Sequence, residues 1–134
     1  MSLRLAPEKF YIIGTDTSKY HIKLSLADQN YISPYYNEPQ YIEFINAVIK
    51  KDGIDFLHCQ PDTEVGVISE FREKIFAKTL LPSKTAIRTA QNKLDCTSRL
   101  KEFGIPVPLS FRIKGEADIK ITIGIMQSKG INKF

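Results

Sequence analysis

Polar side chains follow two of the apolar runs in this sequence and are the residues best suited to bind a ligand. They are Asp16, Gln60, Asp62 and Glu64. The runs before them, 9–14 and 54–59, have the composition of buried strands. Carboxylates and an amide at strand ends can meet the hydroxyl or other polar groups of a substrate. The same positions suit structural capping, which is the commoner use of Asp16 and an equal alternative for Asp62.

Lys93 is the cation with the most suggestive position. It opens an amphipathic helix that is predicted to end at Gly104, where Ile105-Pro106-Val107-Pro108 follows. A helix C-cap favours a glycine with positive φ, and prolines prevent the helix from resuming. A lysine ammonium can supply the fixed charge that a phosphate requires. The alternative is an exposed lysine in a first helical turn, where its charge is mildly unfavourable against the helix dipole.

The histidines, cysteines and tyrosines do not indicate catalysis. His21 and His58 have no partners at useful spacing, and Cys59 and Cys96 are far apart without metal-ligand spacing. We expect packed or surface histidines and reduced, buried thiols of an intracellular protein. Tyr41 is predicted to serve in packing. No catalytic residue and no metal site is predicted.

The elements that must position these residues alternate between strands and helices. Strands are predicted over 9–14, 30–33, 54–59, 79–81 and 109–113, and helices over 39–53, 62–76, 83–90 and 93–103. A short helix is also expected at 24–27, while 116–128 fits either a helix or a strand. Such alternation predicts an α/β fold with a mostly parallel sheet and helices on both faces. Ligands bind such sheets beyond the carboxyl ends of the strands.

Composition bounds the class of protein. The chain has 134 residues, 43% of them hydrophobic and 25% charged, with a net charge of +4. This length suits one domain with a core. The basic residues are scattered, so no nucleic-acid-binding stripe is predicted. No apolar run approaches the roughly 20 residues that a transmembrane helix needs, so no membrane partner is predicted.

An ordered set of motifs resembles a known family. The segments are Ile12-Ile13-Gly14-Thr15-Asp16, Leu26 to Pro34, Gln60 to Glu64, Leu80-Leu81-Pro82-Ser83, and Asn92-Lys93 through Gly104-Ile105-Pro106-Val107-Pro108. Together they resemble the N-terminal preATP-grasp domain of carbamoyl-phosphate-synthase-like ATP-grasp proteins. Asn92 stands where relatives often have an acid, which puts a carboxylate role there in doubt.

The resemblance implies a Rossmann-like three-layer domain over 5–113 and the start of a truncated ATP-grasp domain over 114–134, so that the chain is incomplete at both ends. It implies a cytoplasmic ligase that uses ATP and Mg²⁺ in its full-length form, with a small carboxylate or amine as substrate. Lys93 would contact ATP phosphates, and Asp16, Gln60, Asp62 and Glu64 would face the substrate. The fragment alone would be inactive and without cofactor, and its open sheet edge could lead to a homodimer.

Two other functions fit the residues. One is a doubly wound dinucleotide or nucleotide-sugar enzyme, whose GxGxxG motif is missing here. The other is a non-enzymatic α/β domain that binds a regulatory ligand. A glycine-rich flap and paired acids after Phe134 would distinguish the ligase from both.

Overall fold

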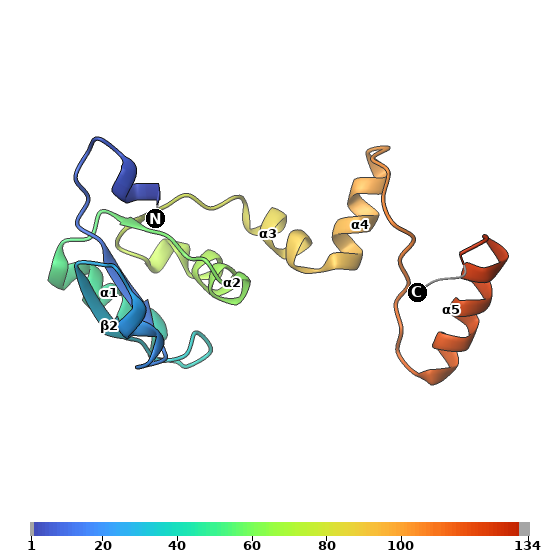
Figure 1. Ribbon diagram of the computed structural model, residues 1–134, viewed down its shortest axis with the longest axis horizontal. Coiled ribbons are helices and arrows are strands. Elements are labelled where there is room, and N and C mark those ends of the chain that lie inside the picture. The colour runs from blue at the N-terminus through green and yellow to red at the C-terminus, as the bar shows by residue number, and fades with distance from the viewer. Residues whose placement is uncertain (1, 132–134) are drawn as a thin grey trace. The chain divides into compact units, whose positions relative to one another are not determined.

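A computed structural model describes residues 2–131, which divide into two compact units, 2–84 and 85–131 (Figure 1). The first unit contains η1 (Ser2–Leu5), β1 (Ile13–Asp16), η2 (His21–Leu24), β2 (Gln29–Ile32), α1 (Tyr41–Asp52), β3 (Phe56–Leu57), α2 (Asp62–Glu70), η3 (Arg72–Lys74) and β4 (Lys78–Thr79). The helices α3 (Lys84–Gln91), α4 (Lys93–Glu102) and α5 (Glu116–Ser128) follow.

The strands form two parallel pairs. β1 pairs with β2, with Ile13 opposite Gln29 and Asp16 opposite Ile32, and β3 pairs with β4. The prediction of an α/β fold with parallel strands is therefore confirmed. The expected single sheet is replaced, in the described residues, by two small sheets of two strands each. β3 and β4 have only 2 residues each, so their ladder is very short.

Gly14 lies inside the first strand and does not end it. The sequence predicts a strand end at Gly14, but β1 continues through it to Asp16. Gly14 lies opposite Asn30 of β2, and a Cβ at Gly14 would stand 2.5 Å from the Asn30 Oδ1 atom. Glycine suits this position because the Asn30 side chain of β2 would have to move to make room for a Cβ.

α1 supplies one face of the hydrophobic core. Tyr41, Ile45 and Ile49 recur every fourth residue on that face and pack with Ile68 of α2 and with Ile75. Lys50 and Lys51 lie in the last turn of α1, where their positive charges interact favourably with the helix dipole. The helix ends at a glycine, residue 53, with a φ of 63°, as the sequence predicts.

Side-chain amide and guanidinium groups fasten the segments around α2. The Asn46 side chain donates to the Lys74 carbonyl oxygen at 2.7 Å and accepts from the Phe76 N–H at 3.1 Å. The Arg72 guanidinium donates to the Pro82 carbonyl oxygen and to the Ser69 hydroxyl, both at 2.7 Å. The helix predicted over 62–76 is shorter in the structure, where α2 ends at residue 70 and a 3₁₀ turn follows.

The second unit is helical in its described part. Gly104 has a φ of 72°, as predicted for the end of α4. The segment 116–128 is a helix, α5, in which the alternating isoleucines lie on several faces. The strand predicted over 109–113 is wrong, since these residues form no regular element. Pro106 and Pro108 lack N–H donors, and the described residues provide no neighbouring strand for this segment.

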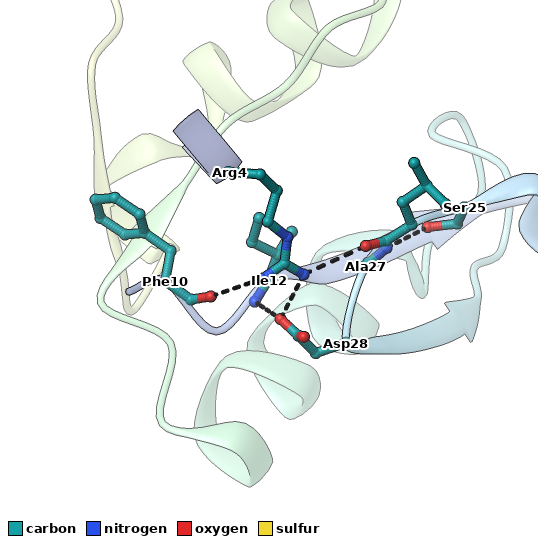
Figure 2. A network of polar contacts seen from close by, with 7 residues as sticks. Arg4, Phe10, Ile12, Ser25, Ala27 and Asp28 are labelled. Carbon is teal, nitrogen blue, oxygen red and sulfur yellow. Dashed lines mark hydrogen bonds and ion pairs between the residues drawn. The ribbon is translucent and has the colours of Figure 1, made fainter. Parts of the chain in front are cut away.

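An ion pair ties the N-terminal segment to the start of the first sheet (Figure 2). The Arg4 guanidinium lies 2.8 Å from the Asp28 carboxylate and also donates to the carbonyl oxygens of Phe10 and Leu26. The Asp28 carboxylate accepts the Ile12 N–H at 2.7 Å. This hydrogen bond, with Arg4, holds the pKa of the Asp28 carboxyl below its usual value. Asp28 therefore has a structural role at the entry to β1.

Asp28→Asn should reduce stability at neutral pH. The Asp28 carboxyl has a lower pKa in the folded state than in the unfolded state. Its ionised form therefore stabilises the fold at pH values above the unfolded-state pKa, and this stabilisation is lost as the pH falls through the folded-state pKa. The urea midpoint of the variant should therefore be lower than that of the wild type at pH 7, and the two should converge below about pH 4. Asp55→Asn, which changes an exposed carboxylate, is the control. Equal midpoints for the Asp28 variant and the wild type at pH 7 would contradict the structural role.

Candidate functional site

Asp16 lies at the carboxyl end of β1 and is held by local hydrogen bonds. Its Oδ1 atom accepts the Ser18 N–H at 2.6 Å, and its carbonyl oxygen accepts the Ser33 N–H at 3.0 Å. Its Oδ2 atom lies 3.8 Å from Nδ1 of His21, too far for a direct hydrogen bond. The capping role is therefore confirmed for one carboxylate oxygen, while the second oxygen faces an exposed imidazole.

Glu64 is a half-buried acid in the first turn of α2. Burial raises the pKa of its carboxyl, a hydrogen bond from Tyr41 opposes that shift, and the nearby Asp16 charge adds to it. Tyr41 is only 2% exposed, and burial raises the pKa of its hydroxyl, with the Glu64 charge adding to the rise. The charge of Asp16 therefore acts on the Glu64 carboxyl, although the two acids follow separate predicted strands.

Cys59 completes this group after the end of β3. Burial, with a smaller contribution from the Glu64 charge, raises the pKa of the Cys59 thiol to about 11. A thiol with such a pKa carries little thiolate at neutral pH, so Cys59 is a poor nucleophile. We name Asp16, Tyr41, Cys59 and Glu64 the strand-end cluster. Sequence reasoning identifies the two acids and misses the other members.

The positions of Tyr41 and Cys59 in the sequence could have identified them as members of the cluster. Tyr41 is the first residue of α1, and Cys59 follows β3 directly before the polar Gln60. Both therefore lie where strand ends and helix starts meet in an α/β fold. The sequence predicts Tyr41 only as a packing residue, yet its buried ring also brings a hydroxyl to Glu64.

Gln60 and Asp62 lie on the exposed side of the same strand end. Both are exposed, and Asp62 is the first residue of α2, with Pro61 in the N-cap position. The N-cap of α2 is therefore Pro61 and not Asp62, which lies one residue further into the helix. An acid in the first helical turn is favourable against the helix dipole. Gln60 and Asp62 can reach a ligand in solvent but are not buried like Glu64.

A shallow cavity of about 380 Å³ adjoins Asp16. Its lining comes from the end of β1 and from η2 with the residue after it, and comprises Gly14, Thr15, Asp16, His21, Ile22, Leu24 and Ser25. Carboxylate, imidazole and hydroxyl groups share this cavity with aliphatic side chains. It is therefore suited to a small ligand with both polar and apolar parts.

Glu64→Gln should raise the stability of the first unit at neutral pH. The pKa of Glu64 is higher in the folded state than in the unfolded state. The protonated carboxyl therefore stabilises the fold at pH values below the unfolded-state pKa, and this stabilisation is lost as the pH rises through the folded-state pKa. The glutamine oxygen can still accept from Tyr41 without a charge. The urea midpoint of the variant should exceed that of the wild type at pH 7, and the difference should shrink towards pH 4.

Glu43→Gln is the matched control for this experiment. Glu43 is an exposed acid in the first turn of α1, where its charge favours the helix dipole. Its replacement should lower the midpoint slightly at pH 7. If Glu64→Gln also lowered the midpoint at pH 7, the half-buried carboxylate would be a stabilising group and the functional interpretation would lose its basis.

Lys93 belongs to the second unit, where it is the first residue of α4 and is exposed. The Asn92 side chain precedes it and accepts the N–H groups of Leu94 and Asp95 at 3.2 and 3.3 Å. Asn92 is therefore the N-cap of α4, a position that favours a short polar side chain.

Within residues 2–131, no group of three or more histidine, cysteine, aspartate or glutamate residues could hold a metal ion. We assign the Mg²⁺ implied by the resemblance no role on the described residues. None of the helices in this part of the chain is long and apolar enough to cross a membrane. Neither a protein-family model nor a curated protein matches the sequence.

Proposed function

We propose that residues 5–113 are the preATP-grasp domain of a cytoplasmic, carbamoyl-phosphate-synthase-like ligase, with a Rossmann-like arrangement and an ATP-grasp domain that begins at 114–134. The observation that carries the proposal is the strand-end cluster. The charge of Asp16, at the end of β1, acts on the Glu64 carboxyl at the start of α2, and the carboxyl ends of parallel strands are where α/β folds bind ligands. The domain forms one wall of the substrate cleft and does not catalyse alone.

The strand-end cluster lowers the stability of the fold at neutral pH, which supports a binding role for it. A half-buried carboxyl with a raised pKa, held by a buried tyrosine, reduces stability at neutral pH. Perturbed acids in such positions are concentrated at functional sites. Asp16 and Glu64 would orient the hydroxyl or amine groups of the small carboxylate or amine substrate, and its own carboxylate would lie away from them, with Gln60 and Asp62 at the solvent edge.

Lys93, in the second unit, would contact the phosphates of ATP. In the reaction that the resemblance implies, a substrate carboxylate oxygen attacks the γ-phosphorus of ATP, which releases ADP and gives an acyl phosphate. An amine then attacks the acyl carbon, the C–N bond forms, and phosphate leaves. A fixed ammonium stabilises phosphate charge in the first step without forming a covalent bond. This chain supplies positioning and charge, and the remaining groups come from the ATP-grasp domain.

Trapping of the acyl phosphate tests the proposal. The full-length protein is incubated with MgATP, candidate carboxylates and hydroxylamine, which converts an acyl phosphate into a hydroxamate. We expect hydroxamate and ADP in equal amounts, with a lower kcat/KM for the carboxylate in Glu64→Gln and an unchanged value in Glu43→Gln. If no candidate carboxylate gives ADP while a small ligand still binds, the non-enzymatic ligand-binding function replaces the ligase.

A further inference from the structure

The cavity beside Asp16 has the chemistry of a site for a polyhydroxylated ligand. We propose that it binds a neutral polyol, either a free pentose or the ribose of a nucleoside, through Asp16, His21 and Ser25. This inference names a ligand class for the Asp16 part of the substrate wall, and its biological role rests on the proposed function. Binding itself is measured on the 134-residue chain, so the two can fail separately.

The gap between Asp16 and His21 favours a hydroxyl group. The 3.8 Å between Oδ2 and Nδ1 is too long for a direct hydrogen bond but allows a single oxygen to lie within about 2.8 Å of both atoms. A hydroxyl can donate to the carboxylate and also pair with the imidazole nitrogen, because it is both donor and acceptor. The side chains are 73% exposed for His21 and 37% for Asp16, so a ligand can reach them.

Ser25 provides a further hydroxyl partner on the cavity wall. Its Oγ atom accepts the Ala27 N–H at 3.1 Å, which leaves its hydrogen to donate (Figure 2). Oδ1 of Asn30, which like Ser25 lies close to Gly14, is buried without a hydrogen-bond partner, so it does not take that hydrogen. The cavity therefore presents an acceptor at Asp16 and a donor at Ser25.

The rest of the lining separates a polyol from other ligand classes. Ile22 and Leu24 provide the apolar surface that the C–H face of a sugar covers. An anion would meet the Asp16 charge, with the acid Glu64 also near Asp16. A wholly apolar ligand would leave the carboxylate without a partner. A neutral molecule with neighbouring hydroxyls satisfies both parts of the lining.

The experiment is a titration of the ¹⁵N-labelled chain with D-ribose, adenosine and 2-deoxyribose, followed by amide chemical shifts. We expect millimolar binding of ribose, with shifts concentrated in residues 14–25, and weaker binding of 2-deoxyribose. Asp16→Asn keeps an oxygen for the Ser18 N–H and should weaken binding about tenfold or more, because a charge-assisted hydrogen bond is lost. Tighter binding of adenosine than of ribose would identify a nucleoside as the source of the polyol.

His21→Ala is the second variant, since His21 is exposed and its loss should leave the fold intact. It should also weaken ribose binding, whereas the controls Asp55→Asn and His58→Ala, which change exposed residues, should not. The inference is overturned if neither ribose nor adenosine shifts residues 14–25. It is also overturned if the shifts persist unchanged in both variants, or if a diamine such as putrescine binds there in place of the sugars.

Discussion

Lys93→Ala in the full-length protein is expected to raise the KM for ATP about ten- to a hundredfold and to leave the KM for the acceptor nearly unchanged. The ammonium of this exposed residue at the start of α4 would make one charge-assisted contact with a phosphate. Loss of such a contact costs roughly 1.5–3 kcal/mol, which corresponds to that change in KM. Steady-state kinetics with ATP and acceptor varied in turn measure both constants.

Lys101→Ala is the control for this variant. Lys101 lies on the same helix, is exposed, and is near the C-terminal end of α4 rather than its start. Its replacement removes the same charge from the same helix and should leave ATP kinetics unchanged. Equal effects of the two substitutions, or no effect of Lys93→Ala, would identify Lys93 as an ordinary surface lysine.

Ile68→Ala is expected to lower the free energy of unfolding of the first unit by about 2–5 kcal/mol. Ile68 is 0% exposed and packs with Tyr41, Ile45 and Ile75 in the core. Truncation removes apolar contacts and leaves a cavity next to Tyr41, which belongs to the same buried cluster. Urea denaturation followed by circular dichroism measures the change.

Leu80→Ala serves as the comparison, because Leu80 is 86% exposed and contributes little buried area. Its effect should be within about 0.5 kcal/mol of zero. If both substitutions changed the urea midpoint equally, residue 68 would not lie in a close-packed core, and the position of α2 against α1 would be wrong.

Local signals explain why the helices are the best-predicted elements. α1 combines a four-residue apolar repeat, basic residues in its last turn and Gly53, all within one short segment. α4 is predicted by its apolar positions and by Gly104, and its N-cap Asn92 is a further local feature. These features act over one or two turns and depend little on the rest of the chain.

Strands depend on partners that are distant in sequence, and the errors are found there. β1 runs through Gly14 because β2 pairs with it as far as Asp16, which no local pattern reveals. The 109–113 segment alternates like a strand but has no neighbour in the described part of the chain. In α5 the same alternation occurs in a helix, whose first turn carries Glu116 and Asp118, acids that interact favourably with the helix dipole.

The candidate site is predictable in part for the same reason. Parallel strands bring their carboxyl ends together, so the sequence alone places Asp16 and Glu64 on one side of the expected sheet. Tyr41 and Cys59 acquire their chemical character from burial beside Glu64, which only the packed chain reveals. The cavity beside Asp16 likewise depends on where η2 returns to β1.

Calorimetric titration with MgATP tests the central claim that this chain supplies one wall of a ligase cleft and not a complete nucleotide site. We expect weak or undetectable binding to the 134-residue chain and clear binding to the full-length protein, which Lys93→Ala weakens about ten- to a hundredfold. Tight binding of MgATP by the 134-residue chain alone, or no binding by the full-length protein, would contradict the account.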